Sequence, residues 1–225
     1  MSDELRELLA RARGTAATAR VLSLDELGAQ RGTEDAPEPW GLAALRGRLV
    51  ELSGHGARAT LTEAMGLILE AQLAGEPAVW IQSPAHGGFY PPDAVESGVD
   101  LAALVVVRVP NAAASARAAE RLLRSGAFGL VVIDLGLGGE ADLSMAQQGR
   151  LVTLAQAHDA AVVCLTEKSA ETASLGSLVS LRAEAMRLRS SSGPEHEVTI
   201  RALKDKRRGP GWSKRGKARG PAGMG

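Results

Sequence analysis

Residues 49–66 read LVELSGHGARATLTEAMG. An apolar run comes first, a glycine-rich turn follows it, and the second half repeats apolar residues at helical spacing. These apolar positions are Leu61, Ala64 and Met65, and Ile68 and Leu69 continue the same spacing just beyond the stretch. The stretch therefore predicts a buried strand, a tight turn and an amphipathic helix.

The rest of the chain repeats this alternation of short apolar runs and helical patterns. Five runs rich in Val, Leu and Ile are predicted as strands, at residues 48–53, 78–82, 103–108, 129–134 and 160–165. Further helical patterns lie at about residues 112–125 and 143–158. The alternation predicts an α/β fold with a mostly parallel central sheet that helices flank on both faces.

The pattern changes near residue 178. The stretches SLRAEAMRLRS and HEVTIRALKD flank the turn-rich SSGPE, which predicts an antiparallel β-hairpin that closes the sheet. We expect three parts: an N-terminal helical segment and linker at residues 1–37, the α/β core at 38–205, and a tail at 206–225. The tail is rich in Gly, Pro, Lys and Arg without apolar periodicity, so it is predicted to be disordered.

The turn after the first strand resembles a phosphate-binding loop but lacks its side chains. Such a loop follows the pattern G-x-x-x-x-G-K-[ST], in which backbone N–H groups and the lysine bind phosphates and the hydroxyl binds magnesium. Counted from Gly54, the second glycine is replaced by Ala59, the lysine by Thr60 and the hydroxyl residue by Leu61. A one-residue deletion would place Arg58 at the lysine position, but an arginine is not an equivalent donor.

Two acidic residues are expected at the same edge of the sheet. Asp134 ends one predicted strand, where a magnesium-binding aspartate would stand, and Glu167 follows the next strand. Where a water-activating glutamate would stand the sequence has Pro84, whose side chain neither donates nor accepts a proton. We expect no catalytic residue and no cofactor. We interpret six residues as a vestigial nucleotide site: Gly54, Arg58, Ala59, Thr60, Asp134 and Glu167.

The net charge of zero conceals a basic C-terminus. Residues 201–225 carry +8, and the first 200 residues therefore carry −8. Basic residues around Trp212, an aromatic able to stack on an unpaired base, predict a tail that binds DNA or a partner protein. A tail that only increases solubility is the alternative. The candidate contacts are Lys204, Lys206, Arg207, Arg208, Trp212, Lys214, Arg215, Lys217 and Arg219.

Composition disfavours several other functions. The single cysteine, Cys164, lies in an apolar run, which predicts a buried thiol in a reducing compartment. The four histidines share no metal-ligand spacing, so we expect no metal site. No apolar run approaches the length of about 18 residues that a membrane-spanning helix needs. We therefore expect a cytoplasmic protein without membrane association.

The order of these elements resembles the ATPase core of RecA-like recombinases over roughly residues 38–208. The matching stretches are RLVELSG, SGVDLAAL, RSGAFGLVVID and VTIRALKDK. A short RecA-like chain with a degraded phosphate loop and a basic tail is similar to the ImuA family, sometimes labelled SulA-like. This resemblance implies a role in bacterial SOS mutagenesis, with an ImuB-like polymerase homologue and RecA as partners.

The resemblance also leaves alternatives open. The segments that follow the strands at 129–134 and 160–165 are short and hold little positive charge, unlike the DNA-binding loops of RecA. A helix is predicted near residues 2–13, and it either packs on the core of its own chain or contacts a neighbouring protomer. The resemblance implies the second, self-association through Leu5, Leu8 and Leu9, because RecA-like proteins bridge protomers with such a segment. The main expectation is a scaffold without catalysis. A RecA-like ATPase with a divergent loop and a SulA-like cell-division inhibitor are the alternatives.

Overall fold

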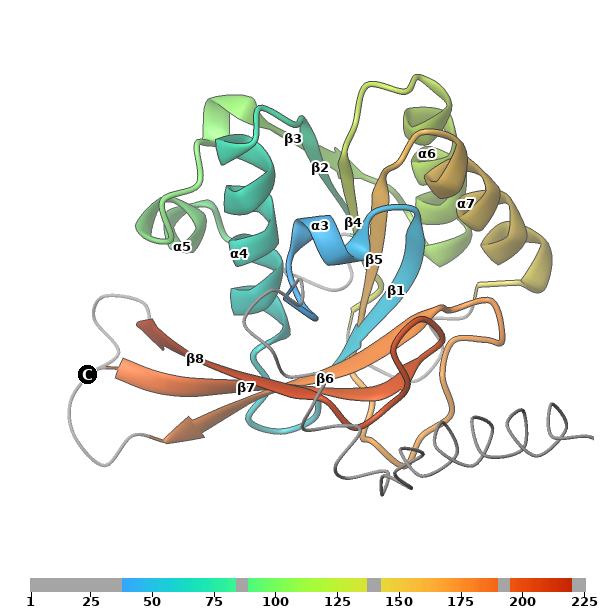
Figure 1. The fold of residues 1–225 in the computed structure, drawn as a ribbon. Helices are drawn as coiled ribbons and strands as arrows, with labels where there is room; N and C mark the ends of the chain where they lie inside the picture. Colours follow the sequence, from blue (N-terminus) through green and yellow to red (C-terminus); the bar gives the residue numbers. More distant parts are fainter. Residues whose placement is uncertain (1–37, 84–88, 137–142, 190–194, 220–225) are drawn as a thin grey trace, which may run out of the picture. The chain divides into compact units, whose positions relative to one another are not determined.

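In the computed structural model, helices cover both faces of a single eight-stranded sheet (Figure 1). The structure describes residues 38–83, 89–136, 143–189 and 195–219, and the part from Pro39 onward is one compact unit. The predicted N-terminal helix, with Leu5, Leu8 and Leu9, lies outside these residues. In chain order the elements are α3 (Leu42–Leu45), β1 (Arg48–Ser53), α4 (Thr60–Leu73), β2 (Ala78–Gln82), α5 (Pro91–Glu96), η2 (Leu101–Ala103), β3 (Leu104–Arg108), α6 (Ala112–Arg124), β4 (Leu130–Asp134), α7 (Met145–Ala157), β5 (Ala161–Thr166), β6 (Leu181–Arg189), β7 (Glu195–Asp205) and β8 (Ser213–Arg219).

The sheet is parallel over most of its width. Its strand order is β3-β2-β4-β5-β1-β6-β7-β8, with parallel pairing from β3 to β6 and antiparallel pairing from β6 to β8. The five strands predicted from apolar runs are confirmed within one residue at each end. The predicted parallel α/β fold with an antiparallel hairpin after it is therefore confirmed. The short elements α3, α5 and η2 were not predicted.

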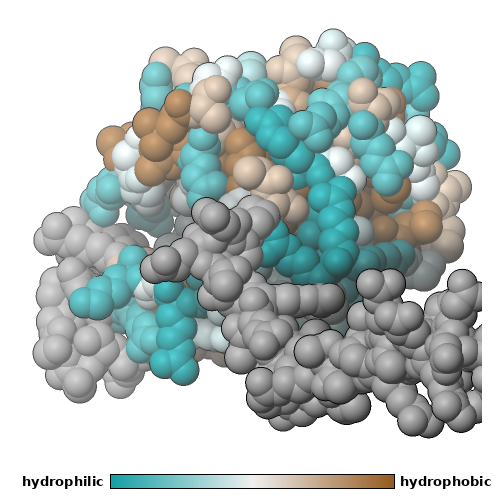
Figure 2. Space-filling view, viewed as in Figure 1, coloured by the Kyte–Doolittle hydropathy of each residue, from teal (hydrophilic) through white to brown (hydrophobic). Residues whose placement is uncertain are grey.

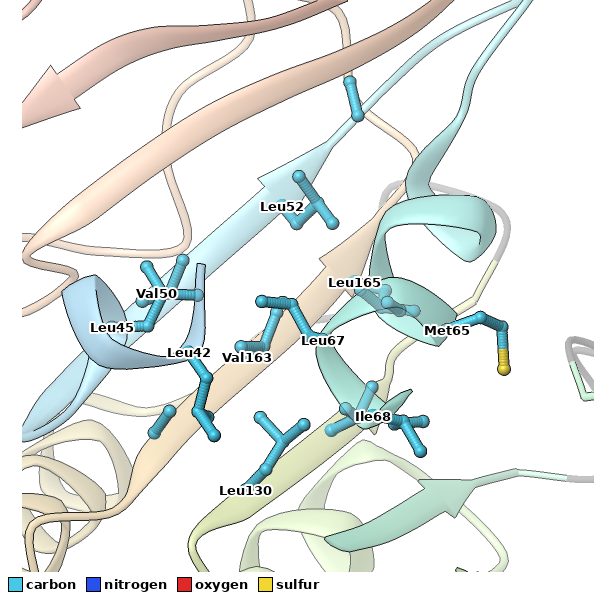
Figure 3. Close-up of a cluster of buried hydrophobic side chains, with 14 of the residues drawn as sticks. Leu42, Leu45, Val50, Leu52, Met65, Leu67, Ile68, Leu130, Val163 and Leu165 are labelled. Carbon is cyan, nitrogen blue, oxygen red and sulfur yellow. The ribbon is translucent and has the colours of Figure 1, made fainter. Parts of the chain in front are cut away.

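Burial on both faces explains why the central strands read as unbroken apolar runs. Val50 and Leu52 of β1 belong to the core on the α3–α4 side, whereas Leu49 belongs to the core under α6 and α7. Figure 3 shows Leu67 and Ile68 of α4 beside the side chains of the central strands on the first of these faces. Each central strand thus supplies apolar side chains to two layers of helices.

The prediction of a disordered tail from residue 206 is wrong for the residues that the structure describes. Strand β8 pairs with β7 in antiparallel register, from Ser213 opposite Arg201 to Arg219 opposite Glu195. Trp212 is half-buried and packs against the core. The missed strand is the last one at its edge of the sheet, where polar and basic residues are typical because pairing stops there. The folded core therefore extends past the expected boundary at residue 205.

A buried ion pair fixes this C-terminal addition to the first strand. The guanidinium of Arg48 lies 2.6 Å from Asp205, and the two side chains are 1% and 0% exposed. Asp205 also accepts hydrogen bonds from the backbone N–H of Arg207 at 2.9 Å and the indole of Trp212 at 3.0 Å. One carboxylate thus joins the start of β1, the end of β7 and the turn before β8.

These contacts set the ionisation of Asp205. Burial raises the pKa of its carboxyl, but the hydrogen bonds from Arg207, Trp212 and Arg48 outweigh burial and leave the pKa below its ordinary value. A carboxyl whose pKa is lower in the folded state stabilises the protein above its unfolded pKa, near about 4. That contribution is lost as the pH falls through the folded pKa.

We predict that Asp205→Ala lowers the free energy of unfolding at neutral pH by about 3–5 kcal/mol, because it leaves the buried Arg48 without its counter-charge. The loss should shrink as the pH falls below about 4, where Asp205 of the unfolded chain begins to be protonated, and should shrink further as the pH falls through the lower pKa of the folded state. Urea unfolding followed by circular dichroism measures both effects. Glu184→Ala, which breaks the more exposed pair with Arg201, is the control and should lose about 1 kcal/mol or less. Equal losses in the two variants would contradict the anchoring role of Asp205.

Candidate functional site

The loop between β1 and α4 is hydrogen-bonded to the strands beside it. The N–H of Ala59 donates to the carbonyl of Ala185 in β6 at 3.0 Å, and the N–H of Arg187 donates to the carbonyl of Ala57 at 2.7 Å. Gly54 donates to the carbonyl of Thr166 at 3.3 Å, and Arg58 donates within the loop to Gly56 at 2.8 Å. Three of the loop's N–H groups are therefore committed to protein carbonyls.

Gly54 is required by this close packing. A Cβ atom at Gly54 would lie 2.8 Å from the carbonyl oxygen of Ala185 and 2.8 Å from the Cβ of Arg58. Such distances are below those that Cβ atoms tolerate, so any other residue would push the loop away from β6. The glycine that begins the loop motif thus serves the contact between the loop and β6.

The side chain of Arg58 is engaged by an acidic residue of the same sheet edge. Its guanidinium lies 2.8 Å from the carboxylate of Glu167, the residue that follows β5, and both side chains are partly exposed. The sequence predicted that Glu167 would lie at this edge, and it does. Arg58 thus neutralises one of the two carboxylates, Asp134 and Glu167, that were expected at this edge of the sheet.

The remaining predicted site residues lie at the end of β4 and at the start of α4. Asp134 ends β4 and is buried, and its carboxylate accepts a hydrogen bond from the N–H of Gly136 at 3.0 Å. This local bond is typical of a carboxylate that caps the end of a strand. Thr60 is buried at the first turn of α4, with its methyl group toward Gly54. Ala59 precedes the helix without a side-chain cap.

A buried carboxylate that the sequence analysis missed lies under this edge. Glu51 of β1 is fully buried and accepts hydrogen bonds from the Ser174 hydroxyl at 2.7 Å, the Leu175 N–H at 2.9 Å and the Thr166 hydroxyl at 3.1 Å. Lys168 and Arg182 approach it at 3.6 and 3.8 Å. A charged residue inside a strand that is covered on both faces needs such partners, and this requirement was the available signal.

Glu51 and Arg182 together hold the segment that follows β5. The guanidinium of Arg182 is buried and donates to the backbone carbonyls of Ser169, at 2.7 Å, and Thr172. Glu51 binds the same segment further along, at residues 174 and 175. The sequence resemblance places a DNA-binding loop of RecA here, whereas in this chain the segment is bound to the core at both of its ends.

The basic residues predicted as one tail are divided into two groups. Lys204 and Lys206 lie at the end of β7 and donate to the backbone carbonyls of residues 176 and 177, and Arg207 donates to the carbonyl of Arg46. Burial, together with the neighbouring Lys206, lowers the pKa of Lys204.

The second basic group lies on β8, where Lys214 donates to the carbonyl of Trp40 and Arg215 pairs with Glu197 at 3.7 Å. The indole of Trp212 donates to Asp205 and its partly buried ring packs against the core, so part of the side chain is engaged internally. Stacking of Trp212 on an unpaired base stays a prediction.

Other predictions of chemistry concern the cysteine and metal ions. Cys164 is buried as predicted, and burial raises the pKa of its thiol, which disfavours a nucleophilic thiolate. Among the residues that the structure describes, no three His, Cys, Asp or Glu side chains are grouped to hold a metal ion. None of the described helices is long and apolar enough to cross a bilayer.

Comparison with known proteins shows similarity to RecA over part of the chain. Protein RecA of Picosynechococcus sp. is 36% identical over 89 residues, which are 40% of this chain and 25% of that RecA. Protein RecA of Cutibacterium acnes is 33% identical over 122 residues, which are 50% of this chain and 34% of that RecA. No family model matches the chain. The parallel sheet and this similarity support a RecA-like relationship, and the chain spans about a quarter to a third of the length of these relatives.

We predict that Glu51→Gln loosens the segment after β5, because the neutral side chain leaves Arg182 and Lys168 without their counter-charge. We expect a loss of stability of about 2–4 kcal/mol and cleavage by trypsin after Lys168 at least about ten-fold faster. Glu171→Gln, an exposed change in the same segment, is the control and should leave the rate unchanged. Equal cleavage rates at Lys168 in the two variants would contradict the role assigned to Glu51.

Proposed function

We propose that this chain is a RecA-like accessory protein without catalytic activity. It acts in the SOS response to DNA damage and in error-prone translesion synthesis, where it binds DNA and partner proteins. The observation that carries the proposal is the loop between β1 and α4, which lacks the phosphate-binding side chains and is hydrogen-bonded to β5 and β6.

Two physical costs oppose nucleotide binding at this loop. A phosphate cradle needs backbone N–H groups that point to the ligand, but those of Gly54, Arg58 and Ala59 already donate to carbonyls. Releasing each bond costs about 0.5–1.5 kcal/mol, and leaving its carbonyl unsatisfied costs more. The guanidinium of Arg58 is paired with Glu167, so phosphate would compete with a carboxylate for Arg58. These costs favour a loop that supports the sheet.

The proposed partners come from the resemblance to the ImuA family. They are an ImuB-like polymerase homologue and RecA itself, and the protein would work with them in the cytoplasm. Similarity to RecA supports a place in DNA repair or recombination. The basic group at the end of β7 gives the chain positive charge for contact with DNA.

A RecA-like ATPase with a divergent loop is the second candidate function. The observation that favours it is Arg58 itself, whose guanidinium is about one-third exposed beside the start of α4. In that case Arg58 would exchange Glu167 for a nucleotide phosphate.

The accessory-protein proposal also includes self-association through Leu5, Leu8 and Leu9, because RecA-like proteins bridge protomers with an N-terminal segment.

We predict that calorimetric titration with ATP and Mg²⁺ detects no saturable binding up to about 1 mM, a binding free energy weaker than about −4 kcal/mol. An active phosphate-loop ATPase in the same buffer is the positive control. Arg58→Ala separates the two candidates, since it should change nothing if the loop does not bind nucleotide. Micromolar affinity that Arg58→Ala abolishes would overturn the proposal in favour of the ATPase.

A further inference from the structure

Helix α6 presents a row of arginines to solvent. Arg117, Arg121 and Arg124 follow the spacing i, i+4, i+7, which places them on one face of the helix, and all three are exposed. The opposite face, which includes Ala116 and Leu123, is buried against the sheet. The basic row is therefore directed away from the core.

Two of these arginines have no partner of their own. No ion pair or side-chain hydrogen bond engages Arg117 or Arg121 within the described residues, whereas Arg124 shares a carboxylate with Arg150 of α7. Glu120 lies 2.7 Å from Arg124 and 2.8 Å from Arg150. One carboxylate thus serves two of the four arginines, and the surface of α6 and α7 retains a positive charge.

A groove is lined in part by the two arginines that share Glu120. It has a volume of about 540 Å³ and is open to solvent, and its lining residues are Arg124, Ala146, Gly149, Arg150, Thr153 and Leu154. Small side chains on α7 leave room beside the arginines for the approach of a ligand. In Figure 2 hydrophilic surface lies at the upper right of the view, over α6 and α7, beside smaller apolar areas.

The positive charge continues on the other side of α7. The Ser177 hydroxyl lies 3.7 Å from the sulfur of Met145 in α7, and Lys206 donates to the carbonyl of the same Ser177 at 2.6 Å. Further along the helix, the guanidinium of Arg207 and the backbone of Gln156 both lie against Gly47. Basic residues therefore flank α7 on both sides.

We propose that this surface binds the phosphate backbone of double-stranded DNA. We call it the arginine band and define it as Arg117, Arg121, Arg124, Arg150, Lys204, Lys206 and Arg207. The band crosses two helices and the turn after β7. With helices packed about 8–10 Å apart, it extends over roughly 20 Å, the length of about six base pairs. The inference rests on the proposed DNA-binding role and assigns its location.

Shape and side-chain chemistry favour a duplex over other polyanions. Stacking on unpaired bases needs exposed aromatic rings, and the arginine band as defined holds none. Arginine binds phosphate oxygens through two parallel N–H donors, and all four basic residues of α6 and α7 that form the band are arginines. A short acidic peptide would occupy the groove alone, whereas a duplex reaches Arg117 and Arg121 on one side of α7 and Lys206 on the other.

The test compares two double variants of the full chain with the same change in charge. Arg117→Glu/Arg121→Glu reverses two exposed residues of the arginine band. Arg215→Glu/Lys217→Glu reverses two exposed residues of β8, the competing location that the basic C-terminus offers and that the band leaves out. The probes are a fluorescein-labelled duplex of random sequence, a labelled thymidine oligomer and a labelled poly-glutamate peptide. Anisotropy is recorded over a series of salt concentrations, and thermal unfolding checks that both variants fold.

We expect Arg117→Glu/Arg121→Glu to weaken duplex binding at least about ten-fold and to reduce the slope of log affinity against log salt by about two, one for each lost phosphate contact. The β8 variant should keep the original slope. Equal loss in both variants, or loss in the β8 variant alone, would overturn the assignment. So would tighter binding of the thymidine oligomer, or binding of poly-glutamate without binding of DNA. None of these outcomes depends on whether ATP binds.

Discussion

Backbone hydrogen bonds hold the loop between β1 and α4 against strand β6. Pairing of Ala59 with Ala185, and of Arg187 with Ala57, makes the loop an extension of the sheet. Helix α4 then begins directly above β1 and β6 and covers the first face of the core. A loop of this kind keeps its strand–turn–helix geometry while its N–H groups serve internal pairing.

Two buried charge clusters stabilise β1 at opposite ends. Arg48 and Asp205 join its start to the turn before β8, and Glu51, with Arg182, holds the segment after β5 near its end. Burying a charge is unfavourable unless it is paired and hydrogen-bonded, so each cluster also specifies which segments must lie together. The Glu51 cluster occupies the region beside the β1–α4 loop with internal contacts. The contacts with DNA and partner proteins that we propose would then fall on the outer surfaces of the helices and of the terminal strands.

Much of the fold was predictable, because periodicity reports burial directly. The runs at 78–82 and 129–134 are apolar throughout since helices cover both faces, and they were predicted within one residue. Strand β8 was not predictable in this way, because its exposed edge and basic residues remove any apolar alternation. Glu51 was missed because a single acidic residue in a strand forms no periodic pattern. The residues that donate hydrogen bonds to it lie more than one hundred residues away in the sequence. The arginine row on α6 follows a helical spacing, so its exposure was predictable, but its continuation past α7 depends on tertiary contacts.

The loop between β1 and α4 is hydrogen-bonded to the sheet, and we propose that it needs no nucleotide for its order. Hydrogen exchange at the backbone amides of Ala59 and Arg187, with and without ATP and Mg²⁺, distinguishes this loop from one that is ordered by nucleotide. Closure on β6 predicts slow exchange at both amides in the absence of nucleotide and no change when it is added. Rapid exchange that becomes slow only with ATP and Mg²⁺ would contradict this account, because the loop would then be ordered by the nucleotide and not by its hydrogen bonds to β6.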